Sequence, residues 1–210
     1  MIKRTSPKAL ALCTAVMAAV LPGAASAESN FQTGAGALTS TAKVDFQITI
    51  PKILFLQVGS GALYTTLATV NLIDFTVPAA NVGNDTAVTA SALAGDLGNG
   101  VVTAIVRGNN GNITLNATSI GALSNGAAGD SINWSQITTT AAPNTTGTVL
   151  TAPTLTNGVS GNVTLSAVAK VVNQDAKWTY KYANSALVAA GTYGGVNVNN
   201  SRVTYTATLP

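Results

Sequence analysis

Residues 101–117, VVTAIVRGNNGNITLNA, decide the fold class of this chain. Two apolar stretches, residues 101–106 and 113–117, flank the sequence Gly108-Asn109-Asn110-Gly111. Gly and Asn tolerate the positive φ angles that tight turns require. The pattern therefore predicts two antiparallel strands joined as a hairpin.

Similar short apolar stretches recur along the chain and are separated by Gly, Asn and Pro. No segment after residue 27 carries a sustained apolar stripe at helical spacing. We therefore expect an all-β fold with negligible helix, an antiparallel Ig-like β-sandwich that forms a single domain from residue 28 to 210. The remaining expected strands cover residues 43–50, 53–58, 70–77, 132–137, 163–171, 178–182 and 203–209, and residues 121–130 and 139–147 are expected to be loops.

The expected core consists of the inward positions of these strands. In residues 178–182, alternation places Trp178, Tyr180 and Tyr182 on one face, which favours an aromatic core stack over a sugar-binding platform. Residues 53–58 are almost continuously apolar, which is typical of a strand covered on both faces. The full expected core is Phe46, Ile48, Ile53, Phe55, Leu72, Phe75, Val102, Ile105, Ile113, Leu115, Val163, Leu165, Trp178, Tyr180, Val203 and Tyr205.

The first 27 residues have the pattern of a cleaved Sec signal peptide. A basic head with Lys3, Arg4 and Lys8 precedes the apolar run 9–20, and Ala25-Ser26-Ala27 fits signal peptidase. The run is too short to span a bilayer as a stable helix. We therefore expect an exported protein that begins at Glu28, reaches the cell surface or exterior via the periplasm, and has no membrane span after cleavage.

Removal of the signal changes the charge of the protein. Three of the ten Lys and Arg residues lie in the signal, so seven basic residues remain against seven acidic ones and the formal net charge is zero. A chain without a basic patch is not expected to bind nucleic acid. Low net charge favours association between copies, and residues 131–169 contain no charged residue at all.

Residues that support catalysis are nearly missing from the sequence. The chain contains no histidine, and Cys13, its one cysteine, lies in the signal. This excludes Ser-His and Cys-His nucleophiles and ordinary zinc sites. The seven acidic residues are dispersed singly, and Asp96 in the Gly-rich stretch 95–100 is more simply part of a turn than a calcium ligand. We expect a non-catalytic protein with no cofactor and no metal.

Two segments alternate strictly between apolar and polar residues. Near the N-terminus the apolar positions are Val44, Phe46, Ile48 and Ile50; at the C-terminus they are Val203, Tyr205, Ala207 and Leu209. Strands of this kind at a sheet edge are recognised by partner chains through β-augmentation. Both are candidate subunit-contact strands. For residues 43–50 a second interpretation remains open, namely that they are the domain's own first strand.

The signal, the charge-poor body rich in Ala, Thr, Asn, Gly and Val, and the segments KVDFQITI (43–50) and RVTYTATL (202–209) together resemble bacterial fimbrial subunits of the chaperone–usher type. The resemblance covers the whole mature chain and is compositional. It implies an incomplete immunoglobulin-like sandwich that a neighbour's N-terminal strand completes, with other copies and a periplasmic chaperone as partners. The chain departs from the family by lacking a cysteine pair and by carrying Leu209-Pro210 where many members have a penultimate tyrosine.

Three functions are therefore considered. The first is a structural subunit of a surface fibre (a fimbria or pilus) that assembles through strand pairing between subunits. The second is a monomeric secreted or surface Ig-like adhesin that binds carbohydrate. The third, an outer-membrane β-barrel, requires aromatic girdles, whereas the chain has eleven aromatic residues and ends in Leu-Pro.

Overall fold

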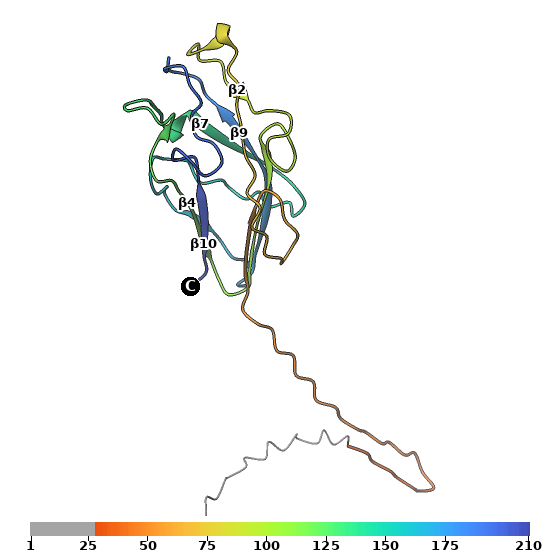
Figure 1. Ribbon diagram of the computed structural model, residues 1–210. Helices are drawn as coiled ribbons and strands as arrows, with labels where there is room; N and C mark the ends of the chain where they lie inside the picture. Colours follow the sequence, from red (N-terminus) through yellow and green to blue (C-terminus); the bar gives the residue numbers. More distant parts are fainter. Residues whose placement is uncertain (1–27) are drawn as a thin grey trace, which may run out of the picture. The chain divides into compact units, whose positions relative to one another are not determined.

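A computed structural model describes residues 28–210 of the chain (Figure 1). The signal peptide predicted for residues 1–27 lies outside the described residues. The chain divides into two units, one that ends at Thr49 and one from Ile50 to Pro210. We call residues 28–49 the arm and residues 50–210 the body, and we describe each by itself.

The fold is nearly all β, as expected, with 30% of the residues in strands and 3% in helical turns. The described residues contain ten strands and two 3₁₀ turns, Ala79–Asn81 and Trp134–Gln136. All pairings between strands are antiparallel. Within residues 28–210, no helix has the length and apolar character needed to cross a membrane.

The larger sheet is built around β9 (Val172–Tyr182), the longest strand. On one side β9 pairs with β3 (Val101–Gly108) and, at its last two residues, with β2 (Val88–Thr89). On its other side it pairs with β7 (Ile137–Ala142). Strand β1 (Leu54–Val58) pairs with the far side of β3 and forms one edge of the sheet.

A smaller sheet has the order β10-β4-β8. Its central strand β4 (Ile113–Thr118) pairs with β10 (Thr204–Thr208) on one side and with β8 (Val163–Leu165) on the other. A separate short pair is formed by β5 (Leu123–Ser124) and β6 (Ser131–Ile132).

Buried side chains from both of the larger sheets form one hydrophobic core. Trp178 from β9 is fully buried, its ring lies 5.3 Å from that of Tyr205 on β10, and its Nε1 donates to the carbonyl of Leu150 at 2.7 Å. The hydroxyls of Tyr180 and Tyr205 also meet across the core at 2.8 Å. The core location predicted for Trp178, Tyr180 and Tyr182 is therefore confirmed, since all three are buried. Their ring contacts are with other residues, Trp178 with Tyr205 and Tyr182 with Phe75.

The hairpin predicted around Gly108-Asn109-Asn110-Gly111 is wrong. β3 pairs with β1 and β9, whereas β4 pairs with β10 and β8, so the turn connects the two sheets. Both strands bury an apolar face in the same core from opposite sides, which a hairpin within one sheet would prevent. Gly108 permits the tight crossing, because a Cβ there would lie 2.8 Å from Ile113 Cδ1.

Four residues expected in the core are exposed. Phe46 and Ile48 are 89% and 83% exposed because they lie in the arm, which pairs with no strand; Ile53 and Leu72 also face solvent. Phe55 and Ile105 are half-buried but do not join the core, because they share the outer face of the larger sheet with Arg107. The other expected residues are buried in the core or pack against it: Phe75, Val102, Ile113, Leu115, Val163, Leu165, Trp178, Tyr180, Val203 and Tyr205. The core also contains residues that were not expected, among them Leu150 and Leu155 from the long connection between β7 and β8.

Several predicted strand boundaries are also corrected. Residues 70–77 run extended without joining a strand ladder, although Ile73, Phe75 and Val77 still pack on the core. Residues 132–137 are broken by the second 3₁₀ turn, and residues 139–142, expected in a loop, belong to β7. β9 begins at Val172, six residues before the predicted start.

Candidate assembly surface

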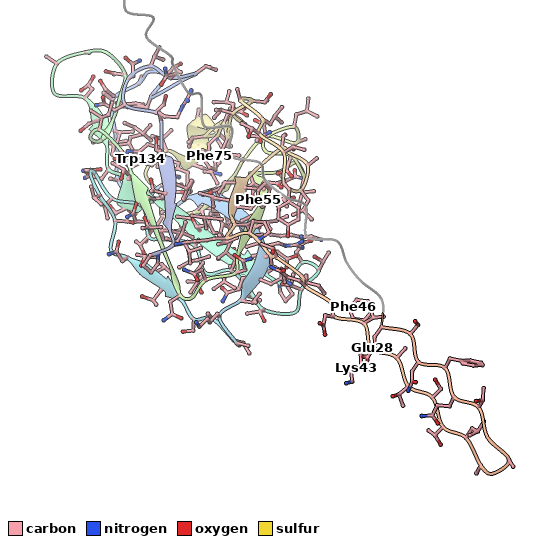
Figure 2. All side chains as sticks on the ribbon, turned by 90° about the horizontal axis from the view of Figure 1, so that it is seen from below. Glu28, Lys43, Phe46, Phe55, Phe75 and Trp134 are labelled. Atoms are coloured by element: carbon pink, nitrogen blue, oxygen red, sulfur yellow. The ribbon has the colours of Figure 1, made fainter. Side chains whose placement is uncertain are left out.

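The arm carries a row of apolar side chains that nothing in the unit covers. Val44, Phe46 and Ile48 are 67%, 89% and 83% exposed, and the row continues into the first residue of the body with Ile50, which is 76% exposed. In Figure 2 the side chain of Phe46 stands out from the arm backbone. Among the described residues, none from 43 to 50 belongs to a strand. The interpretation of this segment as the domain's own first strand is therefore contradicted.

The rest of the arm folds back on itself only loosely. Glu28 and Lys43 come side by side, with 4.0 Å between Oε2 and Nζ, and the Ser40 hydroxyl donates to the carbonyl of Asn30 (Figure 2). Both charged side chains are largely exposed, so the ion pair contributes little to stability. These contacts leave the apolar row and its backbone available to another chain.

The first residues of the body are fixed by side chains of its turns. Asn109, in the turn between β3 and β4, accepts from the backbone N–H of Ile53 at 2.8 Å and donates to the carbonyl of Pro51 at 2.7 Å. Lys52 Nζ donates to the carbonyl of Pro210 at 2.5 Å. The chain is therefore anchored immediately after the apolar row ends.

The second predicted contact strand is present as β10, and it lies at the edge of the smaller sheet. It pairs with β4 on one side, and on its other side no strand of the described residues is paired to it. Tyr205 and Ala207 pack on the core, together with Val203 and Leu209 just outside the strand, while the intervening threonines are exposed. The backbone N–H and C=O groups along this free side are therefore available for a further strand.

The larger and the smaller sheet each have an edge strand at the same side of the core, and these two edge strands are neighbours. β1 is the edge of the larger sheet and β10 that of the smaller one; the two strands are in contact but form no ladder. Leu56 and Val58 of β1, and Ala207 and Leu209 at the C-terminus, are only partly buried there. Residues 53–58 were expected to be covered on both faces, and the sequence did not reveal that they form a sheet edge.

Asp175 is the one buried carboxylate among residues 28–210, and it has a structural role. Asp175 on β9 is 1% exposed and accepts hydrogen bonds from the backbone N–H and the hydroxyl of both Thr145 and Thr146. Burial by itself raises the pKa of Asp175, but these hydrogen bonds outweigh burial and hold the pKa below its ordinary value of 3.8. The carboxylate therefore holds Thr145 and Thr146, in the connection between β7 and β8, against β9.

Asp96 and Tyr205 also have structural roles. In residues 28–210, no group of three His, Cys, Asp or Glu side chains is close enough to hold a metal ion. Asp96 accepts from the backbone N–H of Thr103 at 2.9 Å and so stabilises its own turn. Burial raises the pKa of Tyr205 to about 12, which keeps its hydroxyl protonated in the core.

Comparison with protein-family models, with curated proteins and with solved structures found no match to this chain.

Proposed function

We propose that this protein is a non-catalytic, exported structural subunit of a bacterial surface fibre, and that copies of it assemble by strand pairing. The observation that supports this most strongly is the exposed apolar row Val44, Phe46, Ile48 and Ile50. Contiguous exposed apolar side chains on a protein surface mark an interaction site. The partners are other copies of the chain or related subunits, with a periplasmic chaperone as a transient partner that covers the row before assembly.

The energetics favour burial of the row in a partner. Fully burying one large aliphatic or aromatic side chain stabilises by about 1.5–3 kcal/mol, so four such side chains offer about 6–12 kcal/mol before the entropy of ordering the arm is subtracted. Because alternate residues of a strand point to opposite faces, the apolar row can enter a groove while Lys43, Asp45 and Gln47 stay in water.

The acceptor in this proposal is the side of the body where the edges of the two sheets adjoin. An added strand gains backbone hydrogen bonds along the free side of β10, and its apolar row covers the partly buried side chains of β1 and β10. The two sheets that share one core are in keeping with the finer proposal of an Ig-like sandwich that lacks one strand.

The test is a pair of substitutions on opposite faces of the arm. Phe46→Asp puts a charge into the apolar row and is expected to abolish fibres, as seen by negative-stain microscopy, because the charge would be buried unpaired in the acceptor. Gln47→Asp introduces the same charge one residue away on the polar face and should leave assembly intact.

The monomeric state separates the outcomes of this test. The Phe46→Asp protein should elute as a folded monomer in size-exclusion chromatography, with unchanged circular dichroism. Fibres of normal length from this variant would contradict the assembly role of the row. If the wild-type protein is itself monomeric at every concentration, the second function, a monomeric secreted or surface adhesin, replaces the first.

A further inference from the structure

A small cavity of about 220 Å³ lies on the body where β1, β3 and β9 meet near the turn that leads to β4. Ile53, Tyr64, Arg107 and Asn173 are among its lining residues. Alternate residues of β3 are buried in the core, so Arg107 points to the outer face of the larger sheet. Phe55 on β1 and Asn173 on β9 are its direct neighbours across the two ladders.

No carboxylate among residues 28–210 forms an ion pair with Arg107. Its Nε is buried and has no hydrogen-bond partner in the part of the chain that the structure describes. The only ion pair within residues 28–210 joins Lys43 and Glu28, so no carboxylate lies within 4.0 Å of the guanidinium. Its nearest compensation is the ring of Tyr64, whose centroid is 5.8 Å from Cζ. A buried donor left without an acceptor is costly, and the guanidinium as a whole is left without an anionic partner in this part of the chain.

Tyr64 is held over the arginine in an unfavourable backbone conformation. Its φ is 59°, in the left-handed region that bulky side chains rarely adopt. The ring packs edge-on against Phe55, with 5.4 Å between the ring centroids, and the side chain remains 57% exposed. Backbone strain of this kind persists where the surroundings impose it, and it is concentrated at ligand sites. The strained residue therefore presents an aromatic ring to solvent beside the unpaired cation.

We propose that this cavity binds a sugar ring that carries a carboxylate, such as a hexuronic acid. The planar guanidinium of Arg107 accommodates a carboxylate in a two-pronged arrangement that lysine cannot reproduce. The exposed Tyr64 ring offers a flat apolar surface for the C–H groups of the sugar, and Asn173, opposite Arg107 in the ladder, offers an amide to its hydroxyls. A cavity of this size admits one ring, which favours a saccharide unit over an extended acidic peptide.

This site is separate from the arm and from the free side of β10, because none of its lining residues belongs to either. It therefore goes beyond the proposed function and does not depend on the arm. The Phe46→Asp protein, which is expected to be monomeric, should bind the sugar as the wild-type protein does.

The test is titration of the purified protein with D-glucuronate, with D-glucose and acetate as the separate neutral and carboxylate probes, followed by NMR. Glucuronate should bind, while glucose and acetate should bind at least about tenfold more weakly, because each makes only part of the contacts. Arg107→Gln should weaken glucuronate binding by about tenfold or more, and Arg107→Lys should restore little of it.

Controls make each outcome decisive. Lys181→Gln removes the same charge from an exposed site on β9 and should leave binding unchanged. Tyr64→Gly relieves the positive φ and should give a folded protein that binds glucuronate more weakly, which keeps the test valid if Arg107→Gln fails to fold.

Equal binding of acetate and glucuronate would overturn the saccharide assignment. Undetectable glucuronate binding, or equal loss in Lys181→Gln, would overturn the site, and binding of an acidic peptide instead of glucuronate would assign the cavity to a protein partner.

Discussion

The segments at residues 43–50 and 203–209 have the same alternating pattern but different structures. The C-terminal segment forms β10, pairs with β4 and places Tyr205 against Trp178 in the core. The N-terminal segment forms no strand, and its apolar row is exposed. Alternation therefore specifies a strand-forming segment and its two faces, but not whether the partner lies in the same chain. The following predictions test that difference, beginning with the largest expected effect.

Truncation of the core aromatic that β10 covers should destabilise the body strongly. Trp178→Ala removes a fully buried indole and its hydrogen bond to the Leu150 carbonyl, and we expect a loss of about 3–5 kcal/mol in the free energy of unfolding. Urea denaturation followed by circular dichroism measures the change. A loss below about 1 kcal/mol would mean that β10 does not depend on this core.

Removing a carboxylate should destabilise the protein when that carboxylate lies in the body, but not when it lies in the arm. Asp175→Asn weakens four hydrogen bonds at a buried site and should cost about 1–3 kcal/mol, whereas Asp45→Asn in the exposed arm should leave the unfolding free energy of the body unchanged. Denaturation of both variants at pH 7 is the measurement. Equal losses would contradict the distinction between body and arm.

The carboxylate of Asp175 should also make the unfolding free energy of the wild-type body depend on pH. The pKa of Asp175 is lower in the folded protein than its ordinary value of 3.8, so the folded state favours the ionised form. Its contribution is fully present above pH 3.8 and is lost as the pH falls through the lower folded pKa. The acid-dependent part of the unfolding free energy should therefore be smaller in Asp175→Asn than in the wild-type protein.

The smallest effect is expected for an aromatic residue of the arm. Phe46→Ala removes a large apolar side chain that is 89% exposed, so the free energy of unfolding of the monomeric body should change by less than about 0.5 kcal/mol. Thermal unfolding at a protein concentration where only monomer is present provides the measurement. A loss of 2 kcal/mol or more, on the order of a core truncation, would show that the arm packs within its own chain.

The sequence allowed the fold class and most strands to be predicted, because alternation and apolar runs are local properties. It did not allow strand partners to be predicted. The turn at residues 108–111 has the composition of a hairpin, yet β3 and β4 lie in different sheets, because each must bury its apolar face against the other across the core. Choice of partner depends on contacts between residues far apart in the chain.

The candidate sites, like the strand partners, could be predicted from the sequence only in part. Residues 44–50 and 203–209 were predicted as candidate contact strands from their pattern, while the exposure of the first segment and the free side of β10 became visible only with the fold. The cavity at Arg107 was not predicted, because Tyr64 and Asn173 are far from it in sequence and the positive φ of Tyr64 has no signal in the residues around it.

The anchoring of Pro51, Lys52 and Ile53 has a mechanical consequence. A pulling force applied to the arm reaches the body through these residues, and β1 is the strand that follows them in the chain. The hydrogen bonds from β1 to β3 run across the strand, over five residue pairs, so they bear such a load together instead of opening one after another. A force directed along β1 is therefore carried by the whole ladder between β1 and β3.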